Sequence, residues 1–276
     1  MTFSIVARSA QGDRWGVAVA SKFLAAGAVV PAVTSPLGAV ATQSFANLRY
    51  IPEAFAMLRE GVAASDVLDR LVAADDGRAQ RQVGIVDGQG RAATFTGGDC
   101  LPWAGGASGP NYAIQGNILA GAEVVPAMEA AFCAADADMP LARRLHAALL
   151  AGDRAGGDSR GRQSAAVLVG GIGAGYGGGS DIEVDLRVDD HPDPVVELGR
   201  LLDIHSLLFG KPTETWPLAG DVEQRLRRAL DRLGYDDPDL ERALERAAGV
   251  ENLEERLVPG AIDPVVLAHL EDMNPR

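Results

Sequence analysis

The residue with the clearest chemical potential is Thr2, which follows the initiator methionine and opens an alternating segment over residues 2–8. A small residue at this place allows Met1 to be removed, and removal would leave a hydroxyl and a free α-amine on Thr2. The α-amine has an ordinary pKa of about 8, so it can act as a base near neutral pH. A threonine hydroxyl beside its own terminal amine is an activated nucleophile. The ordinary alternative is a strand residue without a chemical role.

A hairpin is predicted to place a lysine close to Thr2. Residues 2–8 and 15–20 both read as strands, and residues 9–13 read as the turn between them. If the turn centres on residues 11–12, paired residue numbers sum to about 23, and Thr2 lies opposite Ser21 and next to Lys22. Lys22 is one of only two lysines in the chain. A cation there would lower the pKa of the Thr2 amine by like-charge repulsion, whereas the alternative is a solvated strand end.

A glycine-rich loop over residues 156–166 carries alternating polar and charged residues into another strand. Loops at strand ends often carry function, and Arg160 and Arg162 are spaced so that they could form a fork for a carboxylate or phosphate. Asp158 and Ser164 belong to the same loop. It is not a Walker A loop, because the GxxxxGK[ST] pattern is absent. The alternative is a charged turn whose arginines pair with nearby acids.

An acidic strand follows, with Asp181, Glu183, Asp185, Arg187 and Asp189 at alternate positions and therefore on one face. Carboxylates on one face repel one another unless cations lie between them. A divalent metal could supply the cation, but no histidine joins the cluster, so we favour pairing with arginines. A solvated face is the third alternative.

Polar residues also end other predicted strands. The amide of Asn117 could donate a hydrogen bond to an oxyanion, although an asparagine after glycine is also typical of a plain turn. Gln43 lies at a second polar strand end with the same ambiguity. Cys100 and Cys133 form no metal motif, and the four histidines have no paired spacing. We therefore expect no metal and no organic cofactor.

Composition excludes several classes of protein. The 276 residues carry a formal net charge of −13, which argues against a nucleic-acid-binding protein. No apolar run reaches the length of about 18 residues that a membrane span needs, and no signal peptide is evident at the start of the sequence. We therefore expect a cytoplasmic protein that does not bind membranes.

Blocks of strands alternate with pairs of helices up to about residue 210, which predicts an α+β fold with antiparallel sheets and helix layers. The remaining residues, 211–276, show no strand pattern and predict three short helices. We expect two domains, at residues 1–210 and 211–276. Strands are predicted at residues 2–8, 15–20, 29–34, 38–45, 82–87, 91–96, 111–114, 163–169 and 182–188, and helices at residues 50–60, 64–74, 123–135, 141–150, 194–208, 222–233, 238–248 and 264–270.

Several segments of the chain are characteristic when taken together, namely residues 2–8, 16–19, 21–23, 38–43, 115–117, 161–166 and 184–192. They resemble the bacterial DUF1028 family, which is assigned to the Ntn-hydrolase-like superfamily. The resemblance covers about residues 2–209. It implies a four-layer αββα sandwich and an N-terminal nucleophile, which would be Thr2, in a superfamily whose members cleave amide bonds. The tail resembles a small peptidoglycan-binding-like helical module.

The sequence thus predicts an N-terminal-nucleophile amidohydrolase that acts on a small amide or peptide-like substrate after removal of Met1. Thr2, Lys22 and Asn117 are the predicted catalytic residues. The expected partners are a small amide or carboxylate-bearing substrate and further copies of the chain in a homodimer or larger homo-oligomer. A non-catalytic protein that binds a small molecule or a cell-wall fragment is the alternative. The residues expected to bind substrate are Gln43, Asp158, Arg160, Arg162, Ser164, Asp185 and Arg187.

Overall fold

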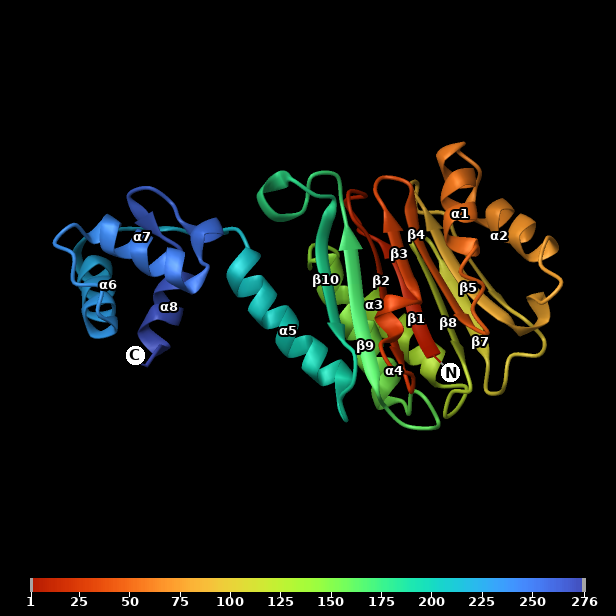
Figure 1. Cartoon of the computed structure of the whole chain (residues 1–276). Coiled ribbons are helices and arrows are strands. Elements are labelled where there is room, and N and C mark those ends of the chain that lie inside the picture. The colour runs from red at the N-terminus through yellow and green to blue at the C-terminus, as the bar shows by residue number, and fades with distance from the viewer. Residues whose placement is uncertain (1, 275–276) are drawn as a thin grey trace. The chain divides into compact units, whose positions relative to one another are not determined.

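Two antiparallel sheets form the centre of the first 202 residues in the computed structural model, which describes residues 2–274. The larger sheet has the strand order β10-β9-β2-β1-β8-β7, and the smaller sheet has the order β3-β4-β5-β6 (Figure 1). These strands are β1 Thr2–Arg8, β2 Trp15–Ser21, β3 Pro31–Thr34, β4 Gly38–Ser44, β5 Arg81–Asp87, β6 Ala92–Thr96, β7 Gly105–Gly109, β8 Tyr112–Asn117, β9 Ser164–Gly170 and β10 Ile182–Val188.

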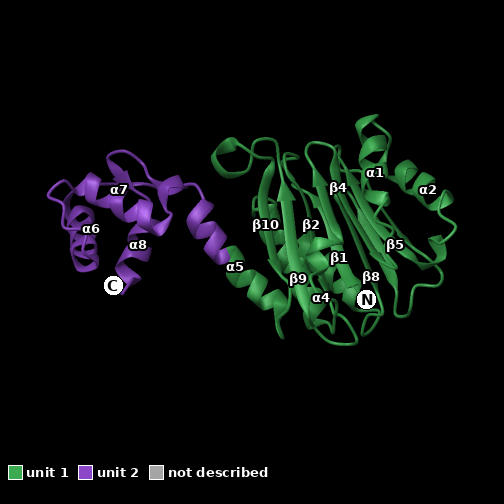
Figure 2. Ribbon diagram, in the orientation of Figure 1, with its two compact units in different colours: residues 1–202 green, residues 203–276 purple. Residues whose placement is uncertain are grey.

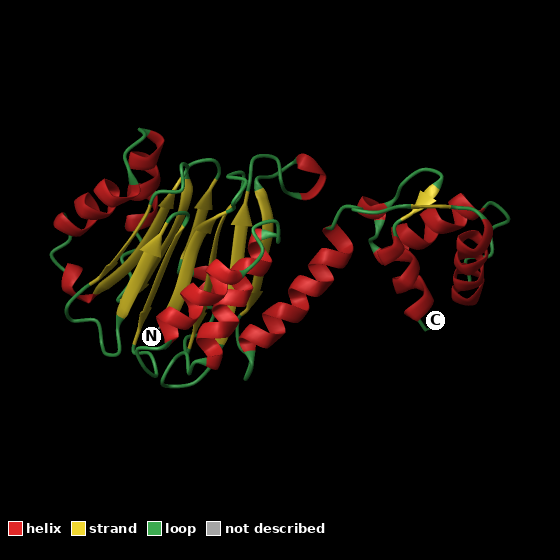
Figure 3. Cartoon of the chain, turned by 180° about the vertical axis from the view of Figure 1, so that it is seen from behind, coloured by secondary structure: helices red, strands yellow, loops and turns green. Residues whose placement is uncertain are grey.

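Helices cover the outer faces of both sheets, so the layers follow the order αββα (Figure 1, Figure 3). Helices α1 (Tyr50–Arg59) and α2 (Ala64–Ala73) pack on the smaller sheet, and α3 (Val124–Ala134) and α4 (Leu141–Arg154) pack on the larger one. This arrangement confirms the predicted α+β sandwich.

The alternation within β1 explains how one strand serves two layers. Phe3 and Ile5 are buried against the helix layer together with Met128 and Leu145. Val6, on the opposite face, packs between the two sheets. Burial of each large apolar side chain stabilises the fold by about 1.5–3 kcal/mol, so a shift of the register by one residue would exchange the two faces and is strongly disfavoured.

The hairpin of β1 and β2 has the predicted register. Phe3 pairs with Ala20 and Arg8 pairs with Trp15. On its other side β1 pairs with β8, where Thr2 lies directly opposite Asn117. The first strand of the chain therefore lies inside the larger sheet, with a partner strand on each side.

Strand β7 differs from the sequence-based expectation, which left this segment outside the strands. Its sequence, Gly-Gly-Ala-Ser-Gly, contains neither the branched nor the aromatic residues that are typical of strands. It is a strand because its main chain pairs with β8 from Gly105↔Gly116 to Gly109↔Tyr112. Strand β8 also extends to Asn117, three residues beyond the predicted end.

The chain divides into two compact units, residues 1–202 and 203–276 (Figure 2). The division falls within α5 (Pro194–Phe209), whereas the sequence-based boundary lies after residue 210. The second unit contains α6 (Gly220–Leu233), α7 (Leu240–Glu251), α8 (Pro264–Asp272) and two short strands, β11 (Trp216–Pro217) and β12 (Ala261–Ile262). Leu226, Leu244 and Leu267 contribute to its apolar core. Within residues 2–274, no helix is both long enough and apolar enough to cross a membrane.

Candidate active site between the two sheets

Thr2 lies at the beginning of β1, where the larger sheet faces the smaller one. Its side chain is 6% exposed, and its Oγ1 lies 3.1 Å from the Oγ of Ser21 at the end of β2. Both hydroxyls are buried, so each benefits from the other as a hydrogen-bond partner. The pairing that the sequence predicted therefore brings two hydroxyl groups together at one end of the sandwich.

Two amide side chains hold the main-chain carbonyl of Thr2. Gln43, on β4 of the smaller sheet, donates from Nε2 to this oxygen at 3.2 Å, and Asn117 donates from Nδ2 at 3.5 Å. The same two nitrogens donate to Oε1 of Gln82, each at 2.8 Å. Gln82 therefore orients both amides toward Thr2.

The amide network continues away from Thr2 through neutral side chains. Ser4 donates to Oε1 of Gln43 at 2.6 Å and accepts from Nε2 of Gln115, also at 2.6 Å. Gly84 leaves room for this network, because a Cβ there would lie 2.1 Å from Oε1 of Gln115. Hydrogen bonds in such a low-dielectric setting are strong when every member is satisfied, so the network holds the two sheets in one relative position around Thr2.

The backbone is strained directly after both amide donors. Ser44, which follows Gln43, has a φ of 68°, and Ile118, which follows Asn117, has a φ of 49°. These left-handed conformations are uncommon for non-glycine residues and rarest for a branched one. Each costs about 1–3 kcal/mol and persists only where the surroundings enforce it, which happens most often at functional sites.

Asp158 fastens the glycine-rich loop to the end of β2. Its buried carboxylate accepts from the main-chain N–H of Lys22 at 2.7 Å and from the main-chain N–H of Arg160 at 2.9 Å. The guanidinium of Arg160 pairs with the same carboxylate at 3.3 Å and donates to the carbonyl of Lys22 at 3.0 Å. The loop is thereby held next to the strand end that carries Ser21.

Lys22 directly follows Ser21, and its ammonium belongs to the same set of contacts. The Nζ donates to the main-chain carbonyl of Arg162 at 3.3 Å, and the side chain is exposed. The structure therefore places the main chain of Lys22 beside the pair formed by Thr2 and Ser21, while its ammonium bonds to the loop.

Arg162 is paired with acids of its own chain. Its Nε lies 2.7 Å from Asp153, and its Nη1 lies 3.2 Å from Asp193. The hydrogen bond with Asp153 raises the pKa of the Arg162 guanidinium. Because Arg160 is likewise paired with Asp158, a substrate carboxylate would have to compete with these internal carboxylates for either guanidinium.

Ser164 holds the chain that follows β2. It lies opposite Ser21 in the pairing of β2 with β9. Its hydroxyl donates to the carbonyl of Phe23 at 2.6 Å and accepts from the N–H of Ala26 at 3.1 Å. The contacts of Ser164 thus fix the course of residues 22–26 beside the site.

Asp185 and Arg187 lie elsewhere in the larger sheet. They form a half-exposed pair at 3.6 Å on β10, the outer strand. Strands β9 and β2 lie between β10 and β1, so the structure does not bring this pair together with Thr2. Glu183 on the same strand pairs with Arg14 at 2.6 Å. In the part of the chain that the structure describes, no cluster of three or more His, Cys, Asp or Glu residues is placed to hold a metal.

Gln82 was missed by the sequence analysis, although it connects the two amides that hold Thr2. The signal in the sequence is a glutamine directly before the apolar residues of β5, where it is completely buried. A buried amide must find partners, so such a position marks a polar network, but the sequence does not identify the partners.

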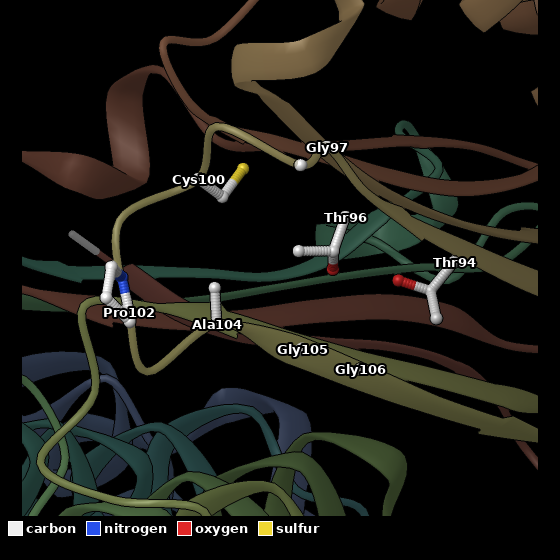
Figure 4. Close-up of a pocket in the computed structure, with 9 residues that line it drawn as sticks. Thr94, Thr96, Gly97, Cys100, Pro102, Ala104, Gly105 and Gly106 are labelled. Carbon is white, nitrogen blue, oxygen red and sulfur yellow. The ribbon is translucent and has the colours of Figure 1, made fainter.

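An open cavity of about 480 Å³ lies beside this network, between the outer strands β6 and β7 of the two sheets (Figure 4). The connection from β6 to β7 closes one side of it. The residues that line it are Thr94, Thr96, Gly97, Gly98, Cys100, Pro102, Ala104, Gly105 and Gly106.

Asp75 organises the loop that follows β4. It accepts from Nε of Arg81, from Asn47 and from the hydroxyl of Tyr50, each at 2.9 Å. The hydrogen bond from Arg81 is the main cause of the strongly lowered pKa of the Asp75 carboxyl. Arg81 also donates to the carbonyl of Phe45 at 2.6 Å, so this charged cluster holds the chain next to Ser44.

Comparison with known proteins places most of the chain in one family. Residues 2–198 match the family model DUF1028, described as a family of unknown function, and residues 207–270 match a model described as "Putative peptidoglycan binding domain". The chain is similar to the crystal structure of protein SPO2555 from Silicibacter pomeroyi, which is attributed to DUF1028, with 30% sequence identity and a TM-score of 0.67. The match covers 81% of this chain and 92% of the SPO2555 chain.

A second solved structure, Anbu (ancestral beta-subunit) from Yersinia bercovieri, has 14% sequence identity to the chain and a TM-score of 0.35. The match covers 75% of this chain and 97% of the Anbu chain. At this score the likeness supports no argument about fold or function. Among curated proteins, none matches the chain.

Proposed function

The chain belongs to the DUF1028 family, and we propose that it is an N-terminal-nucleophile amidohydrolase in which Thr2 attacks a small amide or peptide-like substrate. The family description states no function, so the proposal depends on the chemistry of the site. It requires the removal of Met1, a residue that lies outside the described part of the chain.

The observation that carries the proposal is the position of Thr2 between the sheets. Its hydroxyl lies 3.1 Å from Ser21 Oγ, and amides from both sheets hold its carbonyl. A nucleophile must be held in one orientation to react efficiently. A threonine without a chemical role would need neither a buried polar partner for its hydroxyl nor two side-chain amides on its carbonyl. This degree of positioning therefore favours a chemical role.

The reaction would proceed in two steps: acylation of Thr2 with release of the amine, and hydrolysis of the resulting acyl ester. The α-amine of Thr2 takes the proton from Oγ1 while this oxygen forms a bond to the substrate carbonyl carbon. The same amine then delivers the proton to the leaving nitrogen as the C–N bond breaks, which leaves an acyl ester on Thr2. A water molecule, deprotonated by the amine, attacks this ester, and the carboxylic acid leaves as Thr2 recovers its hydroxyl proton.

The other site residues would support these steps. Asn117 donates to the Thr2 carbonyl at 3.5 Å, the longer of its two hydrogen bonds. This N–H would exchange the carbonyl for the oxyanion that forms in each step. Gln43 would keep Thr2 in place, and Asp158 with Ser164 would hold the loops beside it. Lys22 would tune the amine of Thr2, and the guanidinium of Arg160 or Arg162 would bind a substrate carboxylate in exchange for its internal partner. Asp185 and Arg187 would contact only an extended substrate.

Intact-mass measurement of the purified protein tests the first requirement, because the mechanism needs a chain that lacks Met1. Turnover of a panel of small amides should then be lost in Thr2→Ala and largely kept in Thr2→Ser. Retention of Met1, or equal turnover in wild type and Thr2→Ala, would remove Thr2 from the chemistry.

A non-catalytic binding protein is the second candidate, and one observation favours it. Residues 207–270 match the model described as a peptidoglycan-binding domain, which is a binding function and not a hydrolytic one. This candidate predicts that soluble peptidoglycan fragments bind to wild type and Thr2→Ala alike, measured by calorimetry, with no product formed by either protein.

Self-association is a further part of the proposal. Phe23, Phe45 and Leu101, each more than half exposed, follow β2, β4 and β6. We propose that these side chains form one apolar patch, which is typical of an interaction surface. Light scattering should show a homodimer or larger homo-oligomer, and Phe45→Ser should shift it toward the monomer.

A further inference from the structure

The cavity between β6 and β7 has walls from both sheets. Thr94 and Thr96 come from β6, and Gly105 and Gly106 come from β7. Figure 4 shows the side chains of Thr94, Thr96 and Cys100 around the hollow. Gly106 of β7 keeps this space open, because a Cβ there would lie 2.9 Å from the side chain of Thr94. The volume of about 480 Å³ is within the range of small-molecule sites.

The lining is polar, and none of the described residues that form it has an acidic or basic side chain. It presents threonine hydroxyls, the thiol of Cys100 and the peptide groups of glycines. A charged ligand group in contact with these walls would give up part of its hydration without meeting an opposite charge, whereas a neutral polar group can pair with them. The chemistry of the walls therefore selects an uncharged polar ligand.

Thr96 can donate a hydrogen bond into the cavity. Its Oγ1 accepts from Nε2 of Gln82 at 2.9 Å, and among the described residues its own proton has no acceptor. Thr94 differs, because its hydroxyl can donate to the carbonyl of Val83 at 3.2 Å or to Oε1 of Gln115 at 3.1 Å. The ligand is therefore expected to place a carbonyl or similar acceptor against Thr96.

One side chain connects this cavity with Thr2. The Nε2 of Gln82 contacts Thr96 and the carbonyl of Gly105 in the cavity wall. The Oε1 of Gln82 accepts from Gln43 and Asn117, which both donate to the carbonyl of Thr2. A single carboxamide thus separates the cavity wall from the groups that hold Thr2.

From these contacts we infer that the cavity binds the uncharged, amide-bearing part of a ligand, with an amide carbonyl accepting from Thr96. The identification of this ligand with a substrate of Thr2 rests on the proposed function, whereas the binding itself does not. The cavity should favour substrates in which the part that it binds is a neutral acylated amine. It should disfavour substrates that carry a carboxylate at the same place.

Cys100 lines the cavity and provides the measurement. In a Cys133→Ser background, which removes the exposed thiol of Cys133, the rate of Cys100 alkylation by N-ethylmaleimide is followed by mass spectrometry. N-acetylalaninamide should slow the reaction in a saturable way. N-acetylalanine, which has nearly the same shape but a carboxylate, should protect at least about tenfold less well because its charge is unpaired in the cavity.

Two variants assign the protection to the cavity. Thr96→Val keeps the shape of the side chain but removes its hydroxyl. It should weaken protection by N-acetylalaninamide about fivefold, the effect of one neutral hydrogen bond. The control is Thr34→Val on β3, the far edge of the smaller sheet, which should leave the protection unchanged. Gly98→Leu fills the cavity from a position where an added Cβ meets nothing within 4 Å, and it should abolish protection and slow alkylation.

Equal protection by the two probes, no protection by either, or a Cys100 that does not react in the free protein would overturn the inference. The measurement is repeated in Thr2→Ala, where protection should persist. A protein that shows protection but hydrolyses no amide would contradict the proposed function alone. One that hydrolyses amides without protection would contradict this inference alone.

Discussion

The hydroxyl oxygens of Thr2 and Ser21 lie 3.1 Å apart at the paired ends of β1 and β2, and both are buried. Because Ser21 is the hydrogen-bond partner of the proposed nucleophile, it fixes the direction of the Thr2 hydroxyl. The neighbouring strand therefore contributes directly to the orientation that the chemistry would require.

Replacement of Ser21 by alanine should lower kcat about tenfold with little change in KM, because a misdirected nucleophile weakens the chemical step more than binding. Steady-state kinetics on a small amide measures the effect. Ser108→Ala, on the exposed face of β7, is the matched control and should retain full activity. A Ser21→Ala enzyme with wild-type kcat would show that this contact has no role in the reaction.

Replacement of Gln43 by leucine should destabilise the fold by about 2–4 kcal/mol. The change removes the Gln43 acceptor of the Ser4 hydroxyl and the Gln43 donor to both Gln82 Oε1 and the Thr2 carbonyl, which keep Asn117 as a donor. Each hydrogen bond lost from a buried group costs about 1–3 kcal/mol before relaxation. Urea denaturation measures the free energy of unfolding. Gln89→Leu, at an exposed turn, should change it by less than about 0.5 kcal/mol.

Removal of the ammonium in Lys22→Met should raise the pKa of the Thr2 amine if the two cationic groups repel each other. Because the amine must be unprotonated to act as a base, the acid limb of the kcat profile should move to higher pH, by about half a unit. A pH–rate profile measures this shift, and Lys211→Met, in the second unit, is the control. Superimposable profiles for wild type and Lys22→Met would exclude a tuning role for Lys22.

The Asp75 cluster should make stability depend on pH in acid. Arg81 lowers the pKa of the folded-state carboxyl, so Asp75 binds a proton more readily in the unfolded chain. The contribution of the ionised Asp75 carboxylate to the stability of the fold is complete above the unfolded-state pKa of this carboxyl, which is about 4. This contribution is lost as the pH falls toward the folded-state pKa of the same carboxyl. Asp75→Asn should therefore cost about 3 kcal/mol at pH 7 and progressively less below about pH 4.

Thermal unfolding of wild type and Asp75→Asn across this pH range measures the difference. Asp76→Asn, which changes an exposed neighbour, is the control. A difference between wild type and Asp75→Asn that stays constant down to pH 2 would show that ionisation of Asp75 does not contribute.

The hairpin that positions Thr2 could be predicted because its information is local. Alternation along both strands and the intervening turn determine which residues pair, and the observed register of Phe3 with Ala20 follows from them. The helices could be predicted for the same reason, since their apolar faces repeat at a fixed spacing. Strand β7 could not, because its glycines carry no such pattern and it pairs only through contact with β8.

The sequence by itself determined the helices, the strands other than β7, β11 and β12, the pairing in the first hairpin and the presence of a threonine that could react. Only the tertiary structure decided which groups surround Thr2, because Gln43 and Gln82 reach it from the other sheet and Asn117 from a distant part of the chain. It also decided that Arg162 pairs with Asp153 and Asp193. Periodicity specifies which face of an element is buried, but the partner on that face depends on how separate elements pack.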